Sequence, residues 1–161
     1  MSEFTPVIGQ FGVVKTNGIF GKLIRIGTLS RWNHAFIYVG DGKIVEANPR
    51  GVEVSDVSKY PVIAWNKHQE LSESERQTIA QSALATVGKS YSFLTIALLA
   101  FRILGVRIFS NTWVIAKLAM KEGYICSELV AECYDKAGIV IVNKRDYLTV
   151  PGDLAEVLVY Q

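Results

Sequence analysis

Two apolar runs joined by a short turn predict the fold: Ala35-Phe36-Ile37-Tyr38-Val39, then Gly40-Asp41-Gly42, then Lys43-Ile44-Val45-Glu46-Ala47. Short runs rich in β-branched and aromatic residues are typical of strands, and the Gly-Asp-Gly sequence between them indicates a β-hairpin. Further short apolar runs lie at 12–15, 52–54 and 62–65. Several short strands at close spacing predict a small antiparallel sheet or barrel in the first part of the chain.

The second half of the chain changes to a helical period. Ser72-Glu73-Ser74-Glu75 matches a capping box, with Ser72 as the N-cap. Apolar residues follow at helical spacing up to Gly88: Ile79, Ala80, Ala83, Leu84 and Val87. A second helix is predicted from Cys126 to Gly138, then strands at 139–142 and 157–160 around a turn at 151–154. Strands followed by helices predict an α+β fold.

The composition is that of a chain able to form one domain with a substantial core. Of the 161 residues, 50% are hydrophobic, which excludes a disordered chain. Lys and Arg number 17 and Asp and Glu 15, for a net charge of +2, and no basic run is present. We therefore expect a single domain over 1–161 that does not bind nucleic acid.

The N-terminal sequence and the cysteines indicate a reducing compartment. Residues 1–6 show neither the basic nor the apolar region of a secretory signal, so we expect a cytoplasmic location. Cys126 and Cys133 are seven residues apart, which on one helix is about 10 Å at about 1.5 Å per residue. Because a disulfide requires Cα atoms within about 7 Å, both cysteines are predicted to be free thiols.

One of these cysteines stands where a loop is predicted to become a helix: Gly123-Tyr124-Ile125-Cys126-Ser127-Glu128-Leu129-Val130. A thiol in the first helical turn lies near unpaired backbone N–H groups and the positive end of the helix dipole. Both favour the thiolate, which is the nucleophilic form. The alternative is an inert core cysteine, since Cys126 shares an apolar stripe with Leu129 and Val130.

A base for this thiol is available from only two histidines, His34 and His68. His68 lies in a polar stretch and is expected at the surface. His34 opens the predicted strand 35–39, beside the hairpin, where its side chain can face a cleft. His34 is therefore the candidate base.

The length of the hairpin turn decides which residue can orient His34. With a three-residue turn, Phe36 faces Glu46, and Glu46 shares a face with His34 as a diagonal neighbour. Glu46 would then accept the Nδ1 hydrogen of His34 and leave Nε2 for the thiol. A two-residue turn would place Glu46 on the opposite face, with Asn48 as a substitute. An exposed carboxylate at the rim of the sheet is the alternative for Glu46.

Together these motifs resemble the permuted NlpC-type papain-fold hydrolases, the YiiX-like group. The residues that carry the resemblance are Trp32-Asn33-His34-Ala35 with the following hairpin, Glu46-Ala47, Tyr124-Ile125-Cys126-Ser127-Glu128-Leu129 and Pro151-Gly152-Asp153-Leu154-Ala155. The resemblance covers nearly the whole chain. It implies a circularly permuted papain-like fold, in which a small antiparallel sheet or barrel packs against helices and the histidine strand precedes the cysteine helix.

The resemblance also implies roles for particular residues. Cys126 would be the nucleophile, His34 the base and Glu46 the residue that orients it. Tyr91 would be an oxyanion-hole or substrate contact, with a core aromatic as the alternative. Two departures concern substrate contacts: Val13 follows Gly12 where the family has an acidic residue, and Ser92 follows Tyr91 where an aspartate is common.

The sequence therefore predicts a cysteine-dependent hydrolase acting on a peptide or lipid amide or ester, with no metal or cofactor. A lipid acyltransferase of the same fold and a non-catalytic interaction module are the alternatives. The apolar segment 93–119, interrupted by Arg102 and Arg107, is predicted as a buried helix. Its alternative is a surface for an acyl chain, a membrane interface or a second subunit.

Overall fold

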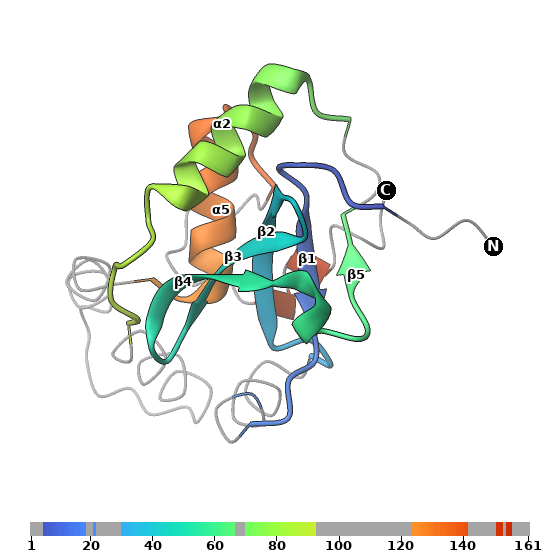
Figure 1. Ribbon diagram of the computed structural model, residues 1–161, viewed down its shortest axis with the longest axis vertical. Coiled ribbons are helices and arrows are strands. Elements are labelled where there is room, and N and C mark those ends of the chain that lie inside the picture. Colours follow the sequence, from blue (N-terminus) through green and yellow to red (C-terminus); the bar gives the residue numbers. More distant parts are fainter. Residues whose placement is uncertain are drawn as a thin grey trace, which may run out of the picture.

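The fold is known from a computed structural model, which describes residues 5–18, 21, 30–66, 70–92, 124–141, 151–152 and 154–155. At its centre is a five-stranded antiparallel sheet in the order β4-β3-β2-β1-β5 (Figure 1). The strands are β1 (Phe11–Val14), β2 (His34–Gly40), β3 (Lys43–Asn48), β4 (Gly51–Asp56) and β5 (Ala64–Trp65). With the helices described below, this confirms the predicted α+β class.

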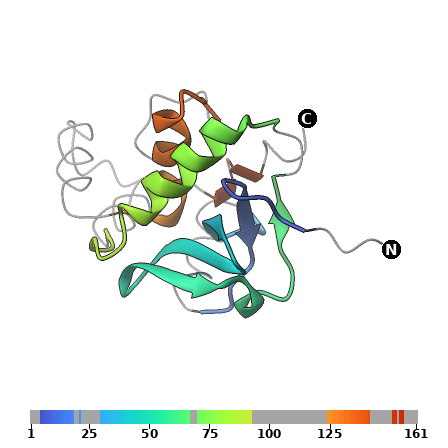
Figure 2. The ribbon, with the colours of Figure 1, turned by 45° about the horizontal axis from the view of Figure 1, so that its top comes forward.

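Two helices, α2 (Glu73–Leu84) and α5 (Cys126–Lys136), pack against each other on one face of the sheet (Figures 1 and 2). Apolar side chains from both helices and from that face form the main core, among them Ile37, Val45, Ile79, Leu129 and Tyr134. Alternation along the strands sends the other side chains to the opposite face. There Val14, Phe36 and Ile44 form a smaller cluster, covered by residues 57–65, which include the short helix η1 (Val57–Lys59).

The start of α2 follows its sequence signal and its end does not. Ser72 caps the helix and the Glu75 carboxylate accepts a hydrogen bond from the Ser72 backbone N–H, as the capping box predicts. The helix ends at Leu84, about one turn before Gly88. Leu84, the last residue of the helix, and Val87, beyond its end, are 46% and 43% exposed and do not continue the buried stripe.

The β2–β3 hairpin contains an irregularity that corrects the predicted turn. Gly40 pairs with Lys43, which leaves a two-residue turn of Asp41 and Gly42, with φ of 51° and 70°. Positive φ at both positions is typical of the tight turns that join antiparallel strands. The register shifts between Tyr38 and Gly40, so that Val39 is an extra residue in β2.

Two predicted elements of the C-terminal region are wrong. Residues 139–141 form no strand, because the Ile139 N–H donates to the Tyr134 carbonyl and Gly138, with φ of 79°, turns the chain out of α5. The predicted turn at 151–154 has helical backbone at its described residues, since proline is well suited to a first helical turn. Within it, Leu154 is fully buried in the main core.

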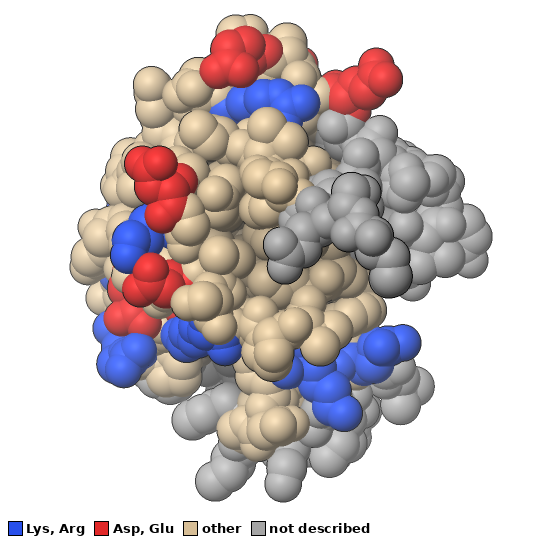
Figure 3. All heavy atoms as spheres, turned by 45° about the vertical axis from the view of Figure 1, so that its right-hand side comes forward, with Lys and Arg blue, Asp and Glu red and all other residues tan. Residues whose placement is uncertain are grey.

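Several predictions concern residues outside the described ranges: the apolar segment 93–119, the strand 157–160 and the surface position of His68. In the described part of the chain, no helix combines the length and apolar character needed to cross a membrane. On the face drawn in Figure 3, acidic and basic side chains of the described residues alternate along the left edge, and basic side chains alone lie at the lower right.

Candidate active site

Cys126 is the first residue of α5, as its sequence context predicts. Tyr124, two residues before Cys126, forms a parallel bridge with Tyr91: its N–H donates to the Ser90 carbonyl at 3.0 Å and its carbonyl accepts from Ser92 N–H at 3.2 Å. These bonds fix the chain just before the helix. Cys126 is buried, with 3% of its surface exposed, and is a free thiol, as is Cys133.

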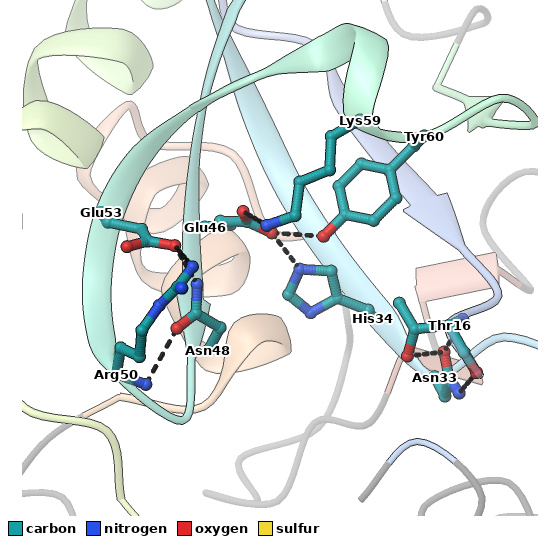
Figure 4. Close-up of polar contacts among 9 residues, drawn as sticks. All are labelled: Thr16, Asn33, His34, Glu46, Asn48, Arg50, Glu53, Lys59 and Tyr60. Carbon is teal, nitrogen blue, oxygen red and sulfur yellow. Dashed lines mark hydrogen bonds and ion pairs between the residues drawn. The ribbon is translucent and has the colours of Figure 1, made fainter. Parts of the chain in front are cut away.

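The side chains of His34 and Glu46 meet on one face of the sheet. Phe36 pairs with Glu46, and His34, two residues earlier on β2, shares its face. The Nε2 atom of His34 lies 2.6 Å from Oε2 of Glu46, and 8% of His34 and none of Glu46 is exposed to solvent (Figure 4). Glu46 is therefore a buried partner of His34 rather than an exposed rim carboxylate.

The ring nitrogen that faces Glu46 is the opposite of the predicted one. Nε2 contacts Glu46, so Nδ1 is left for Cys126. The reason is the diagonal separation of the two residues, about 7–8 Å at Cα. Nε2 is the nitrogen farther from the backbone and can span this distance, whereas Nδ1 stays close to the start of β2.

His34 forms side-chain hydrogen bonds with both Cys126 and Glu46. Burial of the imidazole would lower the pKa of His34, but these two bonds and the negative charges of both partners outweigh it and raise the pKa to about 9. Burial would raise the pKa of Glu46, but the hydrogen bond from His34 and its positive charge, followed by the bond from Lys59, hold it well below its usual range. The pair therefore favours imidazolium and carboxylate.

Two residues of the site were missed by the sequence analysis. The Lys59 Nζ lies 2.6 Å from Oε1 of Glu46, and the Tyr60 hydroxyl donates to Oε2 at 2.5 Å (Figure 4). Both lie at the end of η1, between two predicted strands, in a stretch with no periodicity or motif. No spacing signal could have found them, because their contact depends on how the chain folds back over the sheet.

Asn48, the substitute for Glu46, has a different role. Its Nδ2 donates to Oε1 of Glu53 at 2.6 Å, and its Oδ1 accepts from the Arg50 backbone N–H at 2.9 Å (Figure 4). Both partners belong to the turn between β3 and β4 or to β4 itself. Asn48 therefore stabilises this turn, and Glu46 is the residue that binds His34.

Tyr91 is close enough to Cys126 to respond to its charge. Burial, followed by the charges of Cys126 and Glu128, raises the pKa of Tyr91 above its usual range. Glu128 accepts a hydrogen bond from Ile125 N–H through Oε2 at 3.4 Å, whereas its Oε1 is buried without a partner. Burial and the nearby charge of Glu132 outweigh this bond and raise the pKa of Glu128 to about 7.

Among the described residues, no group of three or more His, Cys, Asp or Glu side chains could hold a metal ion. Cys126 and His34 supply two ligands of the kinds that bind transition metals, while Glu46 is fully enclosed by hydrogen-bond donors.

Comparison with known proteins supports the fold. No protein-family model and no curated protein matches the chain. Among solved structures, the crystal structure of the metalloprotein yiiX from Escherichia coli O157:H7, described as DUF1105, matches with a TM-score of 0.61 and 20% sequence identity. The match covers 87% of this chain and 71% of yiiX. The chain has a YiiX-like fold.

This comparison confirms the YiiX-like part of the resemblance seen in the sequence. The TM-score of 0.61 supports the similarity of the fold, and at 20% identity the match does not extend to activity. Membership of the permuted NlpC-type papain-fold hydrolases stays a prediction, as do the roles of Cys126, His34, Glu46 and Tyr91.

Proposed function

We propose that the protein is a cysteine-dependent hydrolase that acts through an acyl-thioester on Cys126. The observation that supports this most strongly is the position of His34, which forms hydrogen bonds with Cys126 and with the fully buried Glu46. A thiol, an imidazole and an orienting carboxylate in this order are the arrangement required for nucleophilic catalysis. They come from β2, β3 and the first residue of α5.

In the first step, the Cys126 sulfur attacks the carbonyl carbon of an amide or ester. The proton that the thiol gives up is held on Nδ1 of His34 before the attack, because the raised pKa of His34 favours the imidazolium, and Glu46 stabilises this imidazolium through Nε2. As the tetrahedral intermediate collapses, the bond to the leaving nitrogen or oxygen breaks and His34 returns the proton to that atom. The product of this step is a thioester with Cys126.

In the second step, water attacks the thioester. His34 takes a proton from this water and returns it to the sulfur, which releases the acid and restores the thiol. Cys126 carries one of the first N–H groups of α5, which have no acceptor in a preceding turn. This N–H, with Tyr91 as a second contact, would hold the negative oxygen of the intermediate.

The acyl group belongs to a peptide or lipid amide or ester. The same thioester serves a hydrolase when water accepts the acyl group and a lipid acyltransferase when another nucleophile does. A surface for an acyl chain, a membrane or a second copy would lie in the segment 93–119, outside the described residues. We place the hydrolase first because it needs no acceptor besides water.

Alkylation of the native protein with iodoacetamide near neutral pH tests the nucleophile. Peptide mass spectrometry would follow Cys126, with Cys133 as an internal control, since burial raises the pKa of Cys133 to about 12 and no part of it is exposed. We expect faster modification of Cys126 and a loss of this difference in His34→Ala. His68→Ala, which changes the only other histidine, is the matched control.

Burial of Cys126 slows its alkylation by any reagent. The decisive measurement is therefore the ratio of the Cys126 alkylation rates in the wild type and in His34→Ala. Equal, slow labelling of both cysteines in all variants would contradict the proposal and favour an interaction module. A second measurement uses p-nitrophenyl acetate and intact-mass spectrometry. An adduct of one acetyl group that is absent in Cys126→Ala and removed by hydroxylamine would support a thioester, and no adduct on Cys126 would contradict it.

A further inference from the structure

Glu46 binds more donors than an orienting carboxylate needs. Its Oε2 accepts from His34 Nε2 at 2.6 Å and from the Tyr60 hydroxyl at 2.5 Å, and its Oε1 accepts from Lys59 Nζ at 2.6 Å. Ser55 is a further hydrogen-bond partner. Glu46 is fully buried, whereas the side chain of Lys59 is 42% exposed. Lys59 therefore brings a positive charge from the surface to a carboxylate that water does not reach.

The Tyr60 ring is held in place by its own packing. It stacks on Phe36 with centroids 5.4 Å apart and ring planes at 7°, and Lys59 Nζ lies 5.5 Å from its centroid. Figure 4 shows His34, Lys59 and Tyr60 converging on Glu46. Since Phe36 pairs with Glu46 across the sheet, the stack fixes the Tyr60 hydroxyl directly over the carboxylate.

Glu46 faces two basic side chains, His34 and Lys59. The charged and titratable groups that face the Glu46–His34 pair are Cys126 on α5, Glu53 on β4, Arg50 in the preceding turn, and Lys59 and Tyr60 after β4. Arg50 and Glu53 form an ion pair, with Nη2 and Oε1 2.7 Å apart. Lys59 is therefore the cation that contacts Glu46 in addition to His34.

We propose that Lys59 and Tyr60 are positioning residues of the proposed thiol site, which hold Glu46 in place and share its negative charge with His34. A carboxylate bound only by His34 would attract the imidazolium more strongly, and His34 would then release its proton less readily to the leaving group. Lys59 and Tyr60 weaken this attraction without breaking the contact. The inference deepens the proposed hydrolase and rests on it for its catalytic meaning.

NMR titration of the His34 ring nitrogens tests this proposal without requiring any activity. In Lys59→Met, which keeps an unbranched side chain that is one atom shorter and removes the charge, we expect the pKa of His34 to rise by about 0.5–1 unit. Tyr60→Phe, which keeps the stack on Phe36, should shift it in the same direction. Lys59→Arg should restore the wild-type titration, because it restores the charge.

Lys43→Met is the matched control, since Lys43 forms an ion pair of the same length, 2.6 Å, with Asp56 on the same sheet. Unchanged titration of His34 in Lys59→Met and Tyr60→Phe, with the fold intact by circular dichroism, would overturn the inference. So would an equal shift in Lys43→Met. The pH profile of Cys126 alkylation should follow the His34 titration. If wild-type Cys126 is inert, the hydrolase proposal fails while the NMR result still decides how Lys59 and Tyr60 act.

Discussion

The Nε2 atom of His34 lies 2.6 Å from Oε2 of Glu46, although the turn that joins their strands contains only two residues. A two-residue turn with regular pairing would place the two side chains on opposite faces of the sheet. Val39, the extra residue in β2, shifts the register by one and restores the pairing of Phe36 with Glu46. A bulge of a single residue therefore decides whether this pair can form.

Replacement of Glu46 by glutamine should lower the reactivity of Cys126 more than the stability of the fold. The amide keeps a similar shape and removes the charge that stabilises the His34 imidazolium, so the pKa of His34 should fall from about 9 towards 6.5. We expect alkylation of Cys126 near neutral pH to slow by about 10- to 100-fold. Glu53→Gln is the control, because Glu53 pairs with Glu46 across the strands and binds Arg50 and Asn48 instead. A wild-type rate in Glu46→Gln would contradict the role of the carboxylate.

Glu128 should make stability depend on pH. Its pKa is raised from 4.5 to about 7 in the folded protein, so the folded state binds a proton more tightly than the unfolded state. Stability is then lost as pH rises from 4.5 to 7, and the penalty is fully present above 7. Glu128→Gln keeps an acceptor for Ile125 N–H and should stabilise the protein by about 2 kcal/mol above neutral pH.

Urea unfolding at several pH values would measure this effect. In Glu128→Gln, the free energy of unfolding should no longer decline between pH 4.5 and 7. It should still decline from pH 6.5 to 9, where His34 gives up the proton that its raised pKa holds. Equal pH dependence in the variant and the wild type would show that Glu128 does not titrate in this range.

Gly51 should tolerate no side chain. Its φ is 122°, and a Cβ there would lie 2.8 Å from the Lys89 carbonyl oxygen, which accepts a hydrogen bond from Val52 N–H at 2.9 Å. Gly51→Ala should therefore destabilise the protein by about 2–4 kcal/mol in urea or thermal unfolding. Gly42→Ala separates the cost of the positive φ from the cost of the clash, since Gly42 has φ of 70° and open space around it. It should cost about 1 kcal/mol, and equal costs for both variants would rule out the clash.

The Tyr134 hydroxyl should contribute to stability through long-range hydrogen bonds, which include one with the side chain of Asn66. It donates to the Gly9 carbonyl at 2.8 Å in a fully buried position, which ties α5 to the turn before β1. Tyr134→Phe keeps the edge contact with Phe11 and should cost about 1–2 kcal/mol in unfolding measurements. Tyr124→Phe, whose hydroxyl binds the partly exposed Glu132, should cost about 0.5 kcal/mol or less. A larger loss of stability in Tyr124→Phe than in Tyr134→Phe would contradict this prediction.

Local chemistry in the sequence determined most of the elements. The Ser72–Glu75 capping box set the start of α2, and Gly138 set the end of α5. Both signals work through hydrogen bonds between residues a few positions apart, so neighbouring residues suffice to predict them. The same holds for the hairpin and for Cys126 as the first residue of its helix.

Only the tertiary structure decided the surroundings of Glu46. The bulge at Val39, the Nε2 contact of His34, and the approach of Lys59 and Tyr60 all depend on segments that pack across the sheet. The alternation of residues along a strand predicts which side chains share a face. It does not predict a one-residue shift in the pairing or which segment covers that face. Residue types and order were therefore enough to propose Cys126, His34 and Glu46, whereas packing determined which atoms of His34 and Glu46 meet.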